Sequence, residues 1–193
     1  MYEYYGLYQR VRNASWKCLI DFNVVSLPVS SIDIAKQAGI KVVKNSIAHK
    51  LSEVEFSISV YQPAKTRWAI IYDDTLDANE YRWSVAHELG HILLGHEYKC
   101  TNGTFSFETA PNKLEIDADK FALRLLAPAC VIWGLGLQSS DDIAHICGIP
   151  ARYASKRAAR MRELYQRDKF LSSSMEKKVY ENFSSWIEII KKP

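Results

Sequence analysis

One short segment, residues 83–94, constrains the fold of this chain more than any other. It contains His87-Glu88-Leu89-Gly90-His91, in which two histidines stand four positions apart. Residues four apart lie on one face of an α-helix, so the spacing predicts a helix that brings both imidazoles to one point. Two such imidazoles are typical ligands of a tetrahedral zinc ion. Glu88, one step around the helix, is placed to take a proton from a water on that metal.

Apolar residues occupy both sides of the predicted helix. On a helical wheel Trp83 and Leu94 share the face of the histidines, whereas Val85 and Leu89 lie opposite. A helix that is apolar on both sides is buried between other elements, and buried imidazoles need polar partners. The alternative is a core helix that carries two histidines and a surface glutamate by chance. A metal ion supplies the missing partners, so we favour the metal site.

The third metal ligand is not part of this segment. Zinc peptidases with the motif use three protein ligands and leave the fourth position to water. The longer motif that supplies a third histidine is absent, because Leu94 and Glu97 occupy its glycine and histidine positions. His96 is out of register for that motif, so we interpret it as a residue of the helix end.

A second predicted helix, residues 112–128, carries three acids near its beginning. Its apolar residues recur at helical spacing and define a core-facing stripe. Glu115 lies about 50° from the centre of this stripe, nearer than Asp117 or Asp119. An acid that faces a core needs a partner, so we expect Glu115 to be the third metal ligand and Asp119 to orient a ligating histidine. The alternative is that all three acids simply favour the N-terminal end of a helix.

Composition narrows the class of protein. The chain has 193 residues, 48% of them hydrophobic, which suffices for one packed domain or for one domain with an appendage. Its formal net charge of +3 indicates no particular partner. No apolar run reaches the length of a membrane span, and charged residues interrupt the N-terminal segment, so we expect no membrane association and no targeting segment. Cysteines without a C-x-x-C pair are typical of buried thiols in the cytoplasm, and these are Cys18, Cys100, Cys130 and Cys147.

Two β-strands are predicted before the motif helix. Residues 55–61 alternate Phe56, Ile58 and Val60 with serines, which is typical of a half-buried strand. Residues 67–72 form the second strand, which we expect to pair with the first. In metallopeptidases a strand beside the metal helix pairs with the extended substrate, and either strand here is suited to that role. The other predicted elements are helices at 3–22, 32–38 and 175–190 and a strand at 40–43.

Residues 97–112 are polar and are predicted to form a loop at the rim of the cleft. Hydrolysis of this type needs a group that stabilises the oxyanion, commonly a tyrosine or a histidine. Tyr98 is the candidate nearest the end of the motif helix. His96 and Tyr153 are the alternatives.

The segment 139–165 has the outline of a helix-turn-helix. A capped helix, Ile143–Cys147, is followed by a turn at Gly148 and by a second helix, Ala151–Tyr165. Because its basic residues spread around that helix, we favour a helical pair packed on the body of the protein with solvated arginines, and we do not expect direct nucleic-acid binding. The alternative is a basic surface that meets phosphates, made of Arg152, Lys156, Arg157, Arg160 and Arg162.

Two motifs in this order resemble the ImmA/IrrE family of metallopeptidases. They are residues 82–91 and residues 115–128, and the likeness extends in outline from residue 32 to residue 165. The resemblance implies that His87, His91 and Glu115 are the zinc ligands and that Glu88 is the catalytic base. It also implies an α+β, zincin-like fold, with a small sheet, a central motif helix and a C-terminal helical extension.

Members of this family are cytoplasmic proteins of bacteria or mobile elements, and they relieve repression by cleaving or otherwise inactivating a helix-turn-helix repressor. The resemblance therefore implies a zinc endopeptidase with one Zn²⁺ per chain and a repressor as its protein substrate. We expect a metallopeptidase-like domain at residues 1–130 and a helical extension at 131–193, which contains the helix pair 139–165.

The alternative function is a non-catalytic regulatory protein that docks on a repressor, or binds DNA, with a structural or vestigial zinc site. The presence of Glu88 argues against this alternative, because a purely structural site has no use for a base.

Overall fold

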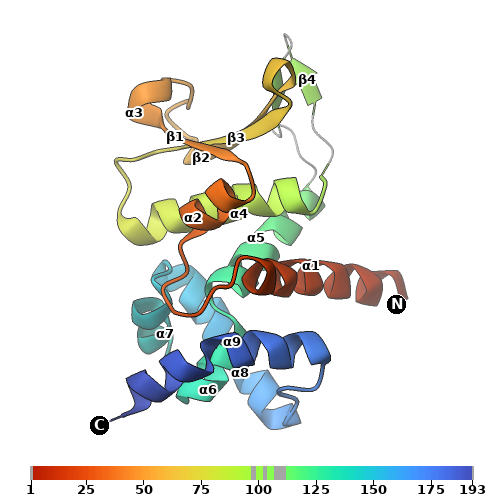
Figure 1. Ribbon diagram of the computed structural model, residues 1–193, viewed down its shortest axis with the longest axis vertical. Helices are drawn as coiled ribbons and strands as arrows, with labels where there is room; N and C mark the ends of the chain where they lie inside the picture. The colour runs from red at the N-terminus through yellow and green to blue at the C-terminus, as the bar shows by residue number, and fades with distance from the viewer. Residues whose placement is uncertain (1, 97–98, 102–103, 107–111, 193) are drawn as a thin grey trace. The chain divides into compact units, whose positions relative to one another are not determined.

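The computed structural model describes residues 2–96, 99–101, 104–106 and 112–192, with the backbone alone for residues 2–8, 99–101, 104–106 and 112. The described chain is α+β, as predicted (Figure 1). Its helices are α1 (Tyr2–Asp21), α2 (Ser31–Gln37), α3 (Asn45–Ala48), α4 (Ala78–Leu93), α5 (Asn112–Leu126), α6 (Ala129–Leu135), α7 (Ser140–Cys147), α8 (Ala151–Arg167) and α9 (Ser174–Lys191), with a 3-10 turn η1 (Pro63–Lys65). Its strands are β1 (Lys41–Lys44), β2 (Ser57–Gln62), β3 (Arg67–Tyr72), β4 (Lys99–Thr101) and β5 (Thr104–Ser106).

The chain divides into two compact units, which we describe separately. The sheet unit comprises Ser30–Ala122, and the helical unit comprises Met1–Val29 together with Leu123–Pro193. Helix α1 belongs to the helical unit because it packs against α9. The division by packing thus differs from the expected boundary at residue 130. The expected division into a peptidase domain and an extension concerns function and stays a prediction.

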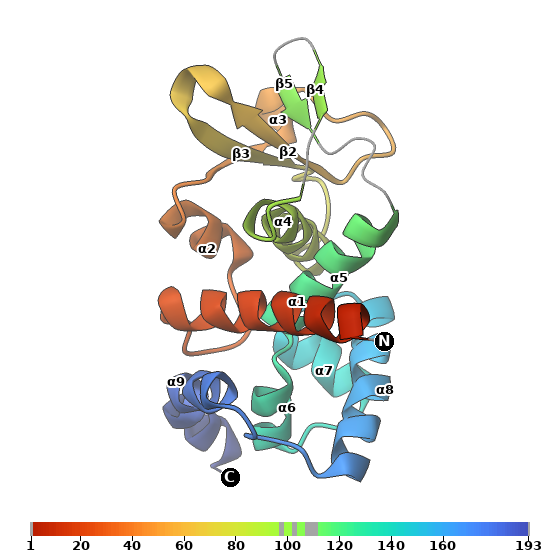
Figure 2. The ribbon, with the colours of Figure 1, turned by 90° about the vertical axis from the view of Figure 1, so that its right-hand side faces the viewer.

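The sheet unit is built on a five-stranded sheet of order β1-β3-β2-β5-β4. Strand β3 occupies the residues predicted for it and pairs with β2 as expected. That pairing is antiparallel, and β3 pairs parallel with β1 on its other side. Its Ile70 is fully buried, as expected for a central strand rich in β-branched residues. Helices α2, α4 and the beginning of α5 lie together on one face of the sheet (Figure 2).

The face of β2 that is buried against α4 is the serine face, whereas its sequence pattern suggests that the apolar face is buried. Ser59 is buried, whereas Ile58 and Val60 are only half-buried and Phe56 is exposed. The small serine side chains allow α4 to approach β2 closely, since the Ser57 hydroxyl lies 3.4 Å from the backbone carbonyl of Ser84. The alternation predicted a half-buried strand correctly, but close helix packing decided which face is covered.

The prediction of a loop for residues 97–112 was wrong for part of that segment. Strands β4 and β5 lie within it and pair antiparallel with each other. Their connection to the sheet is the pairing of Phe105 with Tyr61 of β2. A pairing between positions so far apart in the sequence leaves no local periodicity. The polar composition of residues 97–112 therefore predicted a loop where short strands form.

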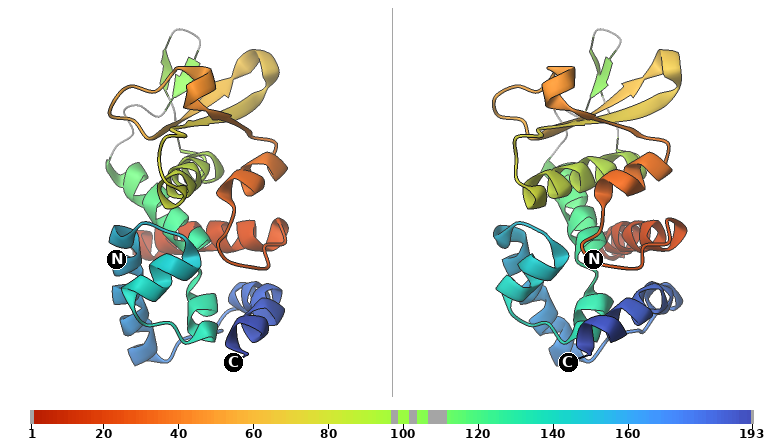
Figure 3. Two further views of the ribbon diagram at one scale, coloured as in Figure 1. Left: turned by 90° about the vertical axis from the view of Figure 1, so that its left-hand side faces the viewer. Right: turned by 60° about the vertical axis from the view of Figure 1, so that its left-hand side comes forward.

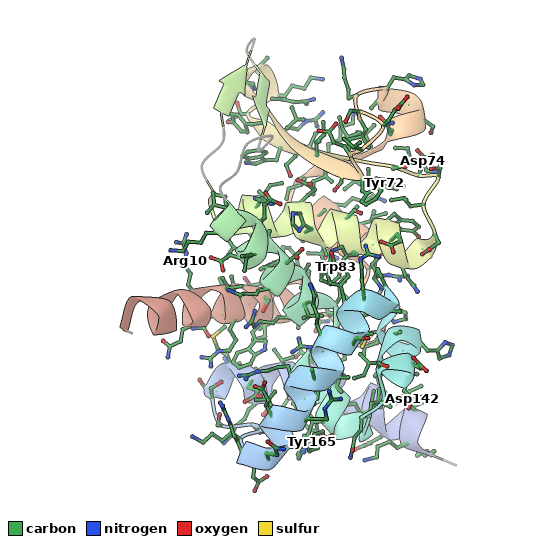
Figure 4. The ribbon with its side chains drawn as sticks, turned by 180° about the vertical axis from the view of Figure 1, so that it is seen from behind. Arg10, Tyr72, Asp74, Trp83, Asp142 and Tyr165 are labelled. Carbon is green, nitrogen blue, oxygen red and sulfur yellow. The ribbon has the colours of Figure 1, made fainter. Side chains whose placement is uncertain are left out.

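Helix α4 carries the motif and is held on both sides. The Asp77 side chain caps its first turn by accepting hydrogen bonds from the backbone amides of Asn79 and Glu80. Trp83, labelled on α4 in Figure 4, is buried, as predicted for a helix between other elements. At Gly90 an added Cβ would lie 3.2 Å from two backbone atoms of Ala118, so the glycine permits the close approach of α5.

The helical unit contains the predicted helix pair, in which α8 packs against α7, while α6 packs against α9 (Figure 3). The Ser139 side chain caps α7, and Gly148 ends it in the left-handed conformation. Ile143 and Met161 are buried in the shared core. The expectation that the arginines of α8 are solvated was wrong for Arg157, which is 5% exposed and donates a hydrogen bond to the Leu123 carbonyl.

Among the helices that the structure describes, none combines the length and the apolar character needed to cross a bilayer. Cys18, Cys130 and Cys147 are free and buried thiols, as predicted. Cys100 lies on β4, where only the backbone is described.

Candidate metal centre

Three side chains from α4 and α5 converge at one point. The Nε2 atoms of His87 and His91 are 3.1 Å apart. One carboxylate oxygen of Glu115 lies 3.1 Å from His87 Nε2, and the other lies 3.3 Å from His91 Nε2. The structure therefore brings together the two histidines of the motif and the acid that the second motif singled out, and this group could hold a metal ion.

The separations between these donor atoms fit a metal ion. Ligand atoms at about 2.0–2.1 Å from a tetrahedral zinc lie about 3.3 Å from one another. The observed separations of 3.1 to 3.3 Å are close to that value, with one Glu115 oxygen facing each imidazole. Two imidazole nitrogens and one carboxylate oxygen are also the donor set of a catalytic zinc, with a fourth position left for water.

Each imidazole is oriented by a partner on its other nitrogen. His87 Nδ1 lies 3.0 Å from an Asp119 carboxylate oxygen, and His91 Nδ1 lies 3.0 Å from His96 Nδ1. A proton on each Nδ1, shared with these partners, leaves both Nε2 lone pairs directed at the common point. Asp119 thus lies where an orienting partner was expected, whereas His96 has the equivalent place beside His91 and was missed.

The electrostatics of the cluster favour a bound positive charge. Burial opposes the imidazolium, but the hydrogen bonds to Asp119 and Glu115 outweigh that effect and raise the pKa of His87 to about 10. The hydrogen bonds from His87 and His91 lower the pKa of the Glu115 carboxyl well below its usual range. The two carboxylates beside His87 therefore favour a positive charge at this point, which a metal cation would supply.

The catalytic-base candidate is fixed by the neighbouring strand. Glu88 is buried, and its two carboxylate oxygens accept hydrogen bonds from two hydroxyls, Ser57 at 3.0 Å and Ser59 at closer range. Both serines lie on β2, two positions apart, so their side chains share the strand face that meets α4. The carboxylate is held in one orientation beside the candidate metal ligands.

The site is buried on one side and open on the other. The side chain of His91 is 2% exposed, whereas that of Glu115 is 45% exposed. The expectation that Glu115 is the acid nearest the buried face of α5 was wrong, because Asp117 is the buried acid and pairs with Lys120 at 3.2 Å. A helical wheel considers one helix only, whereas burial depends on the neighbours around each turn.

Some candidate residues remain untested. Tyr98 lies outside the residues that the structure describes. Tyr153 belongs to the helical unit, where the side chains of Arg152 and Lys156 lie over its ring. The identity of the oxyanion-stabilising residue stays a prediction. The sequence analysis did not identify Ser57 and Ser59 as site residues. The one signal that could have done so is a pair of small polar residues on one face of the strand that precedes the motif helix.

Comparison with known proteins places this geometry in a family. The family model described as peptidase M78, IrrE N-terminal-like domain, matches residues 35–161. The matched segment contains α4, α5 and all of the side chains described above. A search among curated proteins found no significant match.

Proposed function

Because the chain belongs to the peptidase M78 family through its IrrE N-terminal-like domain, we propose that it is a zinc-dependent endopeptidase. The observation that carries the proposal is the convergence of His87, His91 and Glu115 on one point beside a buried, oriented Glu88. A scaffold for a structural metal needs four protein ligands and no base, whereas this arrangement has three ligands and a base.

In this proposal His87, His91 and Glu115 hold the zinc ion. The bound metal would acidify a water and polarise the peptide carbonyl. The Glu88 carboxylate accepts the proton of the attacking water and later delivers it to the leaving amine. Ser57 and Ser59 keep that carboxylate in place during both transfers. Asp119 and His96 hold the two imidazoles in the tautomer that ligation requires.

Of the two strands suited to align the substrate, β2 is the one whose serines hold Glu88. Strand β3 is paired on both sides, by β1 and by β2. Within the described part of the chain, β2 pairs with β5 at Tyr61 alone. We propose that an extended peptide adds to β2 beside Ser57 and Ser59, which brings its carbonyl to the metal ligands and Glu88.

The proposed substrate is a helix-turn-helix repressor encoded beside this chain. The support is the family resemblance of the two motifs. A peptide-bond hydrolase with a half-open site of this kind requires a segment of substrate that is extended and accessible, such as a linker between repressor domains.

The test is co-expression of the chain with that repressor, followed by intact-mass analysis of the repressor. Wild type is expected to yield two fragments, and Glu88→Gln is expected to bind zinc and yield none. Glu80→Gln, on the same helix and distant from the motif, is the matched control and should cleave normally. Relief of repression by Glu88→Gln without cleavage would replace the peptidase proposal with a docking function.

A further inference from the structure

The helical unit contains a second candidate site, which the peptidase mechanism does not use. It is a cavity of about 570 Å³. Its walls come from α1, from the end of α5, from the first residue of α6, from one side of α8, from the segment between α8 and α9, and from the first turn of α9. Cavities of roughly 300–1,000 Å³ are typical of small-molecule sites.

Positive charge dominates the lining. Two acidic side chains, Asp168 and Glu176, contribute to it, against six cationic ones. Arg160 also pairs with Glu163, and Glu176 accepts a hydrogen bond from the Ser172 amide. The cationic side chains are Arg12, Arg124, Arg157, Arg160, Arg167 and Lys169.

Arginine is the main cationic residue of this cavity, and its planar guanidinium matches the geometry of phosphate and carboxylate groups. Burying one member of such a cluster is costly, because its charge loses hydration and is repelled by the neighbouring charges. Arg157 illustrates this cost, since it is 5% exposed. An anion in the cavity would offset both penalties.

The cavity is preorganised. Phe170, which lines it, stacks on Trp133 at a centroid distance of 5.2 Å and also contacts Tyr165, which is labelled near the end of α8 in Figure 4. Among the other lining residues, the Arg12 guanidinium lies 4.7 Å from the ring centroid of Trp16. These contacts fix the walls before a ligand arrives, which reduces the entropy that binding would cost.

We propose that this cavity binds a small phosphate-bearing ligand of about mononucleotide size. The arginines hold the phosphate, and the apolar walls of Trp16, Leu164 and Phe170 contact the remainder of the ligand. A single inorganic phosphate would leave most of the volume and these apolar walls without contact. A nucleic-acid backbone is disfavoured, because the charges line a concavity that includes the buried Arg157, whereas a polymer meets exposed basic residues.

The proposal is independent of the peptidase activity. One structural fact nevertheless connects the two sites, since α5 carries both Glu115 and the cavity residue Arg124. Binding is therefore measured directly on the metal-loaded full-length protein, and cleavage is not the readout.

The experiment is isothermal titration with AMP, inorganic pyrophosphate, inorganic phosphate and adenosine. We expect AMP to bind at micromolar to millimolar concentration, adenosine to show no binding, and added salt to weaken the AMP complex. Absence of binding by every phosphate compound at millimolar concentration would overturn the proposal. Binding of an oligonucleotide that AMP does not displace would also overturn it, in favour of a nucleic-acid surface.

Three variants locate the binding site. Arg124→Gln combined with Arg160→Gln should weaken AMP binding at least about tenfold, because each loses a charged hydrogen-bond donor. Arg167→Gln combined with Lys169→Gln changes exposed residues, so we expect this double variant to fold normally. It should also weaken AMP binding. Arg162→Gln, on α8 but outside the cavity lining, is the matched control and should bind as wild type. Equal affinity in all three variants contradicts the assignment.

Discussion

Ser59 on β2 donates its hydroxyl to the carboxylate of Glu88 on α4, at a position where both residues are buried. This hydrogen bond joins the sheet to the motif helix and fixes the group to which the proposed mechanism assigns the proton transfers. The rate of cleavage should therefore depend on a residue that contacts neither metal nor substrate carbonyl.

Ser59→Ala is expected to lower the rate of cleavage roughly tenfold or more, because a misplaced base loses proton-transfer geometry. Zinc content should not change, since the three ligands keep their own partners. Ser59→Thr retains the hydroxyl and should recover part of the rate. Ser46→Ala, which removes an exposed hydroxyl of the same unit, is the control. A full rate in Ser59→Ala would remove the serine from this role.

His96→Ala is expected to weaken zinc binding about 10–100-fold, because His91 loses the partner that directs its Nε2 at the metal. Asp119→Asn should have a similar effect through His87. Affinity is measured by competition with a chromogenic chelator. His145→Ala, an exposed histidine on α7, serves as the control. Unchanged affinity in both variants means that the ligands orient themselves without these partners.

Gly90→Ala is expected to separate α4 from α5. The new methyl group would meet the Phe121 ring at 3.1 Å and the Ala118 backbone at 3.2 Å, and the backbone cannot rotate away. We expect a loss of stability of about 1–3 kcal/mol together with weaker zinc binding, because Glu115 moves with α5. Thermal unfolding and chelator competition measure the two effects. A variant with wild-type values in both would show that the helices tolerate a wider spacing.

Buried thiols should make the protein less stable in alkali. Burial raises the pKa of Cys130 and Cys147 to about 12, above the ordinary value of 9.0 in the unfolded chain. The contribution of these thiols to the free energy of unfolding is therefore complete below pH 9. It is lost as the pH rises toward 12, because in that range the thiols ionise only in the unfolded chain. Melting temperatures between pH 8 and pH 11 measure the slope, which should be shallower in Cys147→Ala. Equal slopes in both proteins contradict the assignment.

Much of the fold was predictable because local signals agreed with it. Asp77 and Ser139 are of residue types that favour helix caps and each caps a helix in the structure, and β3 has the predicted bounds. The candidate metal ligands were predictable for a physical reason: a tetrahedral site restricts two histidines of one helix, here His87 and His91, to one helical spacing. Glu115 then followed from the second motif.

What could not be predicted depends on contacts between distant segments. The face of β2 that meets α4 is decided by close packing, so Ser57 and Ser59 appeared to be the polar face of an ordinary strand. His96 appeared to be a residue of the helix end until the fold placed it beside His91. The cavity of the helical unit combines residues from α1, α8 and α9, and no single segment of sequence contains its pattern.

The zinc site is tested by the metal content of the purified protein, measured by elemental mass spectrometry beside Glu115→Ala. We predict about one zinc ion per wild-type chain and a large loss in the variant, since a catalytic zinc uses three protein ligands. Asp117→Asn, which changes the neighbouring buried acid, should retain zinc. A wild-type protein that holds no zinc, even after the metal is added back, would contradict the proposed zinc peptidase.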